Sequence, residues 1–444
     1  MPVSSGTPGQ AAAPGSPARG VRVVLDARPL QDPDRTPTSA AYLQNLLGAF
    51  NATPLPGESF ALLLHSDLDD PTSGLGRLDV VGRRMLPPTR LLPAGSFLID
   101  PFVLAGAVVG AAWRAERGGA AGAVYHSASG AIPAVARVPV VATLLDLAPW
   151  ELPARFGRGP LSRLGLRLRS GLLRHADAVI VGSNVAARLA RSVLRVPRSR
   201  LHVVPLAARP EFQALPAGET VEPDERSRQE QERLGLPARY LVYSGRYDAR
   251  QDLPMLLEAL GRLAAAGRPA SLDGTIPWPP RVLLVGAPPD DRAALARVAA
   301  VRGLGETIAY APRLEPARLA SLVRGARAAV MPVRAELAGL PVIEALAVGI
   351  PVVASSVGVL PELVGHAGLL VPPADADRLA IALSTVWVDD GVHAGIAAAA
   401  RASGGAASRT WLDVAAETRQ VYAEAAERHR REGPVQAGRR DGAG

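Results

Sequence analysis

The feature that most constrains the fold of this chain is a repeated alternation of short apolar runs with longer segments of helical spacing. In the first half, the apolar runs have the length and β-branched content expected of strands. They lie at residues 21–26, 60–65, 123–126, 139–145, 178–182 and 201–205. Strands that are apolar on both faces and separated by helices are typical of a parallel sheet covered on both sides. The first half therefore predicts a doubly wound α/β domain.

A second series of the same kind follows a polar stretch. The polar stretch is rich in proline, glycine and charge, which is typical of a linker. The second set of strand-like runs lies at 240–245, 281–286, 306–310, 328–332, 351–355 and 368–372. A length of 444 residues fits two or three domains at about 150 residues each. We therefore predict an α/β protein in which two Rossmann-like domains face one another across a cleft.

The breaks in the pattern predict the domain boundaries. We expect an N-terminal domain at 21–206, a linker at 207–236 and a C-terminal domain at 237–410. A helix at 411–430 is expected to pack back on the N-terminal domain. Ligands of such sheets bind beyond the carboxyl ends of the strands, so the chemistry should lie in the loops that follow them.

Composition excludes several classes of site. The chain has no cysteine, which excludes disulfides, thiolate metal ligands and cysteine nucleophiles. All 49 of its Lys and Arg residues are arginine, so a Schiff-base lysine is excluded as well. The seven histidines are scattered without ligand spacing, and we predict no metal site. A net charge of +8 is modest for this length and only 4% of residues are aromatic, so we expect no nucleic-acid partner.

Targeting and tail signals are weak. Residues 1–20 lack the basic and apolar regions of a signal peptide and predict a disordered tail, and 433–444 predict a flexible one. The apolar run at 102–113 is shorter than the ~20 residues needed to cross a bilayer. We therefore expect a cytoplasmic protein. Segment 154–176 carries six arginines and leucines at helical spacing, which suits either a packing helix or peripheral contact with the inner face of a membrane.

The most informative segment for function runs from residue 336 to 358. Glu336 and Glu344 are separated by seven residues, and Pro341 between them suits the first turn of a helix. The free amides of a helix N-terminus suit a phosphate, and two carboxylates can hold sugar or ribose hydroxyls. The alternative is a capped helix with two solvated glutamates.

This pattern, followed by Ala-Leu-Ala-x-Gly-x-Pro-Val-Val-Ala-Ser, resembles the family 4 glycosyltransferases of the GT-B fold. The resemblance covers most of residues 21–430. Its blocks occur in family order: VRVVLDARPL, VYHSASGAIP, VVATLLDLAP, ADAVIVGSN, LHVVP, YLVYSGRYDARQDLPMLLEAL, GARAAVMPV and PELVGHAGLLVPPAD. The opening block is similar to bacterial mannosyltransferases that use GDP-mannose.

The resemblance implies an activity and its partners. The expected reaction is transfer of a hexose, mannose by the likeness of the opening block, with retention of anomeric configuration. The donor would be a GDP- or UDP-linked sugar and the acceptor a glycan or lipid-linked molecule, as in polysaccharide biosynthesis. The resemblance implies no metal at the donor phosphate and no other cofactor.

The resemblance also implies roles for residues of the C-terminal domain. Glu336 would face the donor sugar and Glu344 would hold the ribose hydroxyls. Gly339 and Leu340 would present backbone N–H groups to the phosphates. Arg246 would bind the diphosphate, where a fixed cation suits a departing anion. Glu336 and Arg246 are therefore the expected catalytic residues.

Several cleft positions depart from the family pattern. Gln251 stands where the family has a lysine, although Arg250 beside it can supply a cation. Leu145 stands where a histidine usually precedes the aspartate, here Asp146. His126 at a strand end could contact the acceptor or partly replace that histidine, so His126 and Asp146 are the candidates on the acceptor side.

Two further departures fall in the same predicted cleft. Pro37 follows the first strand where glycine is common, and Leu337 stands where the family has glycine. The strand and helix pattern is intact, so the changes are concentrated where the chemistry should be. Two interpretations therefore stay open: an active glycosyltransferase, or a catalytically silent relative that binds a nucleotide sugar or acts as a structural partner.

Overall fold

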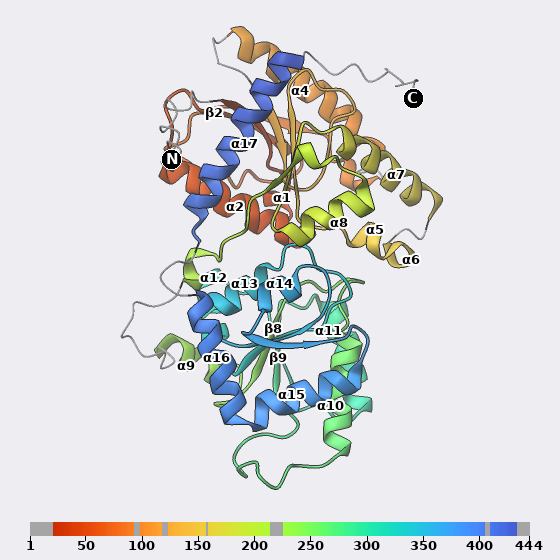
Figure 1. Ribbon diagram of the computed structural model, residues 1–444, viewed down its shortest axis with the longest axis vertical. Coiled ribbons are helices and arrows are strands. Elements are labelled where there is room, and N and C mark those ends of the chain that lie inside the picture. Colours follow the sequence, from red (N-terminus) through yellow and green to blue (C-terminus); the bar gives the residue numbers. More distant parts are fainter. Residues whose placement is uncertain are drawn as a thin grey trace, which may run out of the picture.

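The computed structural model describes residues 21–92, 98–117, 123–156, 159–213, 225–404 and 409–432. The predicted tails at 1–20 and 433–444 lie outside these residues, as does part of the predicted linker. Two α/β domains are stacked along the long axis of the molecule (Figure 1).

The N-terminal domain is built on a seven-stranded sheet in the order β3-β2-β1-β4-β5-β6-β7. All of its strand pairs are parallel. The strands are β1 (Arg22–Asp26), β2 (Ser59–His65), β3 (Val80–Leu86), β4 (Ala123–Ser127), β5 (Val140–Leu144), β6 (Ala178–Val181) and β7 (Leu201–Val203). Six of them match the predicted strands closely. The edge strand β3 was not predicted, because most of its residues are solvent-exposed or half-buried and it lacks an apolar run.

Helices cover both faces of this sheet. They are α1 (Arg28–Gln31), α2 (Pro37–Ala52), α4 (Asp100–Arg117), α5 (Ala148–Glu151), α6 (Pro153–Phe156), α7 (Pro160–His175) and α8 (Asn184–Leu194). Along β1, Val23 and Leu25 pack on the face covered by α2, whereas Val24 packs on the face covered by α4, α7 and α8. This alternation is the side-chain period of a strand buried on both faces.

The C-terminal domain has a six-stranded parallel sheet in the order β10-β9-β8-β11-β12-β13. The strands are β8 (Leu241–Ser244), β9 (Val282–Val285), β10 (Ile308–Ala311), β11 (Ala328–Met331), β12 (Val352–Ser355) and β13 (Gly368–Val371). In both sheets the strand order reverses beside the first strand of the domain, which is the position where such folds bind ligands.

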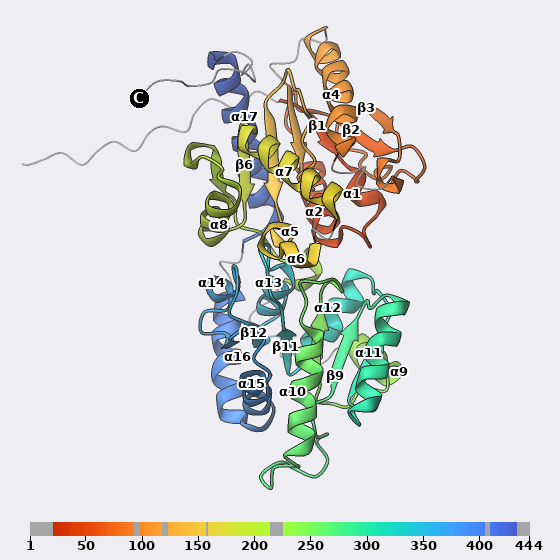
Figure 2. The same ribbon diagram turned by 90° about the vertical axis from the view of Figure 1, so that its right-hand side faces the viewer.

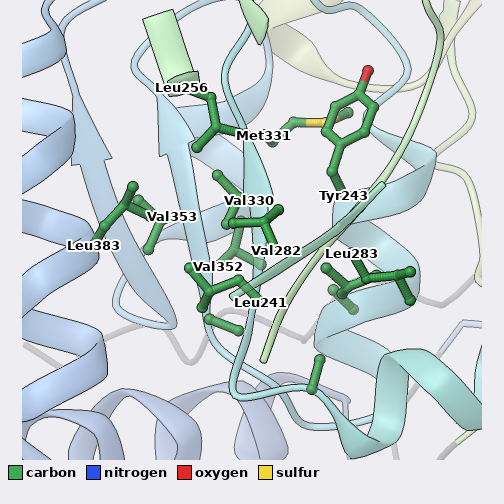
Figure 3. Packing of buried hydrophobic residues seen from close by; sticks show 14 of the residues in the cluster. Leu241, Tyr243, Leu256, Val282, Leu283, Val330, Met331, Val352, Val353 and Leu383 are labelled. Atoms are coloured by element: carbon green, nitrogen blue, oxygen red, sulfur yellow. The ribbon is translucent and has the colours of Figure 1, made fainter. Parts of the chain in front are cut away.

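The helices of this half complete its core. They are α9 (Glu225–Arg233), α10 (Leu253–Ala265), α11 (Pro289–Val301), α12 (Pro316–Gly325), α13 (Leu340–Ala347), α14 (Leu360–Val364), α15 (Ala376–Val388) and α16 (Asp390–Gly404). Figure 3 shows Leu256 of α10 and Leu383 of α15 close to the sheet residues Val330 and Val353, and all four belong to one buried cluster. The apolar runs of the sequence thus become the centre of the domain.

The last helix, α17 (Trp411–Glu432), lies along the N-terminal domain in both views (Figures 1 and 2). Trp411 and Tyr422 belong to the same buried cluster as Tyr42 of α2, and the rings of Tyr42 and Trp411 are 5.7 Å apart. The chain therefore crosses from the C-terminal domain back to the first one.

The apolar run at 102–113 lies within α4, which packs on the N-terminal sheet. Among the residues described by the structure, no helix combines the length and apolar character that crossing a membrane requires.

Candidate active site

The loops after β5, β8 and β11 meet at the boundary between the two domains. Arg250, after β8, donates from Nη2 to Oδ2 of Asp146, after β5, over 2.7 Å. Arg155 of α6 donates to the carbonyl of Ala249 over 2.8 Å. Figure 2 shows α5 and α6 next to the C-terminal domain at this boundary. The fold thus brings Asp146, Arg246, Arg250 and Glu336 to the carboxyl ends of strands, as expected for a ligand site.

Glu336 lies in a loop that binds its own carboxylate. Oε1 of Glu336 accepts hydrogen bonds from the amides of Leu337, Ala338 and Gly339 over 3.1, 3.0 and 2.9 Å. Burial raises the pKa of Glu336, while these amides and Arg250 act in the opposite direction. The amide of Gly339, expected to face a phosphate, is directed at this carboxylate in the ligand-free protein.

The shape of this loop requires glycine at position 339. Gly339 has a φ of 65°, in the left-handed region that L side chains rarely adopt. A Cβ atom there would lie 2.2 Å from Cδ1 of Leu363. Gly339 caps the start of α13, and Leu340 is the first residue of that helix. The loop therefore presents three successive N–H groups, which form an anion-binding concavity.

Glu344, expected to hold ribose, is buried in α13 and paired with Arg209. Nε of Arg209 lies 2.5 Å from Oε1, and Nη2 lies 3.0 Å from Oε2. Burial raises the pKa of Glu344, and the Arg209 guanidinium counters this effect. Arg209 follows β7 in the chain and also lies over the ring of Phe212, 4.9 Å from its centre. Sequence analysis missed Arg209, since nothing local marks it as the partner of a residue 135 positions away.

The two arginines expected at the diphosphate share an aspartate. Nε of Arg246 lies 3.1 Å from Oδ2 of Asp248, and Nε of Arg250 lies 2.9 Å from Oδ1. Gln251 is buried, and within the described part of the chain its side-chain amide has no hydrogen-bond partner. Arg250, the neighbour of the position where the family has lysine, therefore supplies a cation beside Arg246.

A carboxyl group that the sequence did not reveal lies on the N-terminal side. Glu151, at the end of α5, is half-buried, and its Oε2 has no partner among the described residues. Burial raises its pKa, and the nearby carboxylates of Asp146 and Glu336 raise it further. Asp146 also accepts a hydrogen bond over 2.8 Å from the amide of Ala148, the first residue of α5. Glu151 is a further candidate for contact with an acceptor.

His126, expected on the acceptor side, has no exposed surface. Its Nε2 lies 2.8 Å from Oγ1 of Thr143, and its Nδ1 lies 2.6 Å from Oη of Tyr422 in α17. Burial lowers its pKa to about 3. Side chains alternate between the two faces of β4, and the side chain of His126 lies on the face covered by α17. It therefore contacts this helix and cannot reach an acceptor.

The other departures from the family pattern are packed into apolar or helix-starting positions. Leu145 belongs to the cluster under α2 and α17, and Leu337 belongs to the cluster under α7 and α8. Pro37 is the first residue of α2, where a missing N–H costs nothing. These residues shape the boundary between the domains but supply no polar group to it.

A cavity also lies at the boundary between the domains. The linker after β7, α13 and α14 surround a mainly aliphatic cavity of about 340 Å³, whose wall includes Leu206, Leu337 and Val359. Across the described ranges, no three histidine or carboxylate side chains are grouped to hold a metal ion.

Two family models match consecutive parts of the chain. The model "Glycosyltransferase Family 4" matches residues 107–212, and "Glycosyl transferases group 1" matches residues 238–389. The first match lies in the N-terminal half and the second in the C-terminal domain, and together they cover more than half of the chain. The chain belongs to the family 4 glycosyltransferases.

A curated relative of this glycosyltransferase is the D-inositol 3-phosphate glycosyltransferase of Streptomyces bingchenggensis. It is 33% identical over 213 residues, which cover 45% of this chain and 44% of the relative. The chain thus spans about half the length of the curated relatives it matches.

Solved structures show the fold. Sucrose-phosphate synthase from Thermosynechococcus elongatus has a TM-score of 0.66 at 21% identity and covers 91% of this chain and 98% of its own. Anabaena HepE, solved with UDP and glucose, has a TM-score of 0.64 at 16% identity, with coverage of 91% and 100%. The predicted architecture of two facing Rossmann-like domains, the GT-B fold, is confirmed.

Proposed function

We propose that this protein transfers a hexose from a nucleotide-diphosphate sugar to an acceptor held by the N-terminal domain. The observation that carries this proposal is the meeting of Glu336, Arg246 and Arg250 at the strand ends between the domains. The donor nucleotide is a UDP or GDP group, and HepE, with the same fold, was solved with UDP.

In the proposed mechanism, the two guanidiniums bind the diphosphate. The bond between the anomeric carbon and the diphosphate oxygen breaks, and negative charge develops on that oxygen. Arg246 and Arg250 stabilise this charge, as fixed cations do where no metal takes part. We propose that the reaction needs no metal or other cofactor for this reason.

The loop before α13 positions the sugar. Glu336 accepts hydroxyl hydrogen bonds from the sugar, and the amides around Gly339 and Leu340 then turn to the phosphates. The acceptor hydroxyl oxygen forms its bond to the anomeric carbon on the face that the diphosphate leaves, and its proton passes to the departing diphosphate oxygen. Bond formation on that face retains the anomeric configuration. Retention, mannose as the sugar, and Glu344 as the ribose ligand rest on the family resemblance.

The acceptor is the least constrained part of the proposal. Asp146 and Glu151 lie on the N-terminal side of the boundary and can bind acceptor hydroxyls. A glycan or lipid-linked acceptor of polysaccharide biosynthesis is the first candidate. The relatives are named for D-inositol 3-phosphate, which makes a phosphorylated polyol the second candidate.

We also propose peripheral membrane contact through the predicted segment 154–176, now seen mainly as α7. Leu161 and Leu164 of α7 are about half exposed. A hollow of about 590 Å³ beside this helix is lined by Trp150, Leu166 and Arg167 among others. Exposed leucines between arginines suit the surface of an anionic bilayer.

A catalytically silent protein is the second candidate, and a specific observation favours it. Glu336 is bound to its own loop amides, Glu344 to Arg209, and both arginines to aspartates. Leu145 and Gln251 replace two polar groups of the family. A protein of this kind would bind a nucleotide sugar without turnover or act as a structural partner.

Calorimetric titration with UDP, GDP and ADP, followed by an assay of donor hydrolysis, separates these candidates. An active enzyme binds one nucleotide, loses that binding in Arg246→Ala and Glu344→Ala, and hydrolyses the matching sugar donor slowly. Binding without hydrolysis or transfer would favour the silent binder. If no nucleotide binds, the transferase proposal fails and the structural role remains.

A further inference from the structure

We propose that Asp248 is an internal substitute for the donor diphosphate, which holds Arg246 and Arg250 in the ligand-free protein and weakens donor binding. This inference rests on the proposed function, because it assumes that these two arginines bind the diphosphate. It adds a residue that sets the strength of donor binding and to which the family resemblance gives no role.

The geometry of Asp248 is that of an anion between two cations. Its Oδ2 accepts from Nε of Arg246 over 3.1 Å and from Nε of Arg250 over 3.1 Å. Its Oδ1 accepts from Nε of Arg250 over 2.9 Å and from the backbone amide of Arg250 over 3.0 Å. Both guanidiniums are thus gathered by one carboxylate at the end of β8.

The carboxylate competes with a phosphate because both anions fit the same donors. Guanidinium groups bind carboxylates and phosphates through the same planar fork of N–H groups. A diphosphate that binds along the Nε edge of either guanidinium therefore displaces Asp248 from that arginine. The displaced carboxylate also stays close to the phosphates, since its turn is fixed by the chain, and like charges at such a distance oppose binding.

Asp146 adds a second carboxylate from the other domain. Nη2 of Arg250 donates to Oδ2 of Asp146 over 2.7 Å, and only 6% of the Arg250 side chain is exposed. Arg246 in turn donates to the carbonyl of Arg35 over 3.3 Å. Asp248 differs from these N-terminal contacts because it moves with the arginines when the domains separate. Opening the cleft therefore releases Asp146 but leaves Asp248 in place.

The test is Asp248→Asn. Asparagine keeps an oxygen for the backbone amide of Arg250 but removes the negative charge. The nucleoside diphosphate that binds the wild type best among UDP, GDP and ADP should bind this variant about tenfold more tightly, a change of about 1.4 kcal/mol. The corresponding nucleoside without phosphate should bind both proteins equally weakly, which a purely structural effect on the pocket would not produce.

Matched controls separate this effect from general charge. Asp79→Asn removes one exposed carboxylate directly before β3. This position is at the amino ends of the strands, away from the candidate site, and the variant should leave nucleotide binding unchanged. If Asp248→Asn lowers the melting temperature strongly, Asp248→Ser serves as the second variant, because a serine hydroxyl also accepts from a turn amide.

The outcomes distinguish the two proposals. If the wild type binds a nucleoside diphosphate and neither Asp248 variant binds it more tightly, the inference about Asp248 is overturned and the proposed function stands. If wild type and variants bind none of the three nucleotides, both are overturned. Tighter binding in the variants, restricted to phosphorylated ligands, supports both.

Discussion

At the scale of single residues, Glu344 is a buried charged group whose partner is distant in the chain. Glu344 was expected to be a free ligand for ribose, yet Arg209 binds both of its oxygens. Glu344 is almost fully buried, whereas the Arg209 side chain is 18% exposed. Removing the cation from such a pair leaves an uncompensated buried charge, which is costly.

We therefore predict that Arg209→Met lowers the free energy of unfolding by roughly 3 kcal/mol. Urea denaturation at pH 7 measures the change. The matched variant is the double substitution Arg209→Met with Glu344→Met, which removes both charges and should recover most of the loss. Equal losses in the single and double variants would contradict a role for the ion pair.

His126 gives a prediction on pH. Its folded-state pKa of about 3 lies below the unfolded value of 6.5, so the unfolded chain binds the proton more readily between these values. Stability from this group is complete above pH 6.5 and is lost as the pH falls toward 3. The loss between pH 6.5 and 5 should be about 2 kcal/mol, at about 1.4 kcal/mol per unit.

The measurement is the difference between wild type and His126→Gln in chemical denaturation at these two pH values. Glutamine keeps polar atoms for Thr143 and Tyr422 but does not titrate. The variant should lose about 2 kcal/mol less than the wild type on acidification. The same loss in both proteins would show that His126 does not govern this range.

At the scale of elements, α7 and α17 differ in how much of their apolar surface is buried. α17 buries Trp411, Val414 and Tyr422 against the N-terminal sheet. α7 buries one side, including Leu173, but leaves Leu161 and Leu164 about half exposed near its start. The exposed leucines are what the membrane proposal depends on.

We expect the double variant Leu161→Ser with Leu164→Ser to bind vesicles of phosphatidylglycerol at least tenfold more weakly than the wild type. Withdrawing two leucines from the apolar boundary removes about 2 kcal/mol or more of apolar burial, and about 1.4 kcal/mol already corresponds to a tenfold change in affinity. Vesicle sedimentation measures it, with phosphatidylcholine vesicles as the uncharged reference. Val301→Ser, which changes an exposed residue of α11, is the control and should bind like the wild type. If the wild type binds neither kind of vesicle, the membrane proposal fails.

At the scale of the whole molecule, polar contacts of different burial join the two domains. Arg250 with Asp146 is largely buried on the arginine side, while Arg313 with Asp34 is exposed. The aliphatic cavity of about 340 Å³ between the domains shows that apolar packing there is incomplete. An interface of this kind permits the domains to move relative to one another.

We predict that Asp146→Asn shifts the protein toward a more open arrangement. The radius of gyration from small-angle scattering should rise relative to the wild type, because the variant loses the charge that holds Arg250 across the boundary. Asp34→Asn, at the exposed pair, should change it less, since surface pairs contribute about 0–1 kcal/mol. No difference between Asp146→Asn and the wild type would show that the apolar contacts alone hold the domains.

The sequence by itself determined the two parallel sheets and the loops that carry the site. Apolar runs and helical spacing are local patterns, so strands such as β1 and β12 could be predicted within a residue or two. The edge strand β3 lacks that pattern because it is buried on little of its surface. The position of Glu336 and Arg246 followed from their place after strands.

Only the tertiary structure decided what these groups contact. Arg209 on Glu344, Tyr422 on His126 and Asp146 on Arg250 join residues more than 100 positions apart. Such pairs depend on how α17 and the two domains pack, which no local spacing encodes. A buried polar group needs a hydrogen-bond partner, and the partner can come from any part of the chain that the fold brings near. For this reason the charged groups of the candidate site are paired with one another in the ligand-free protein.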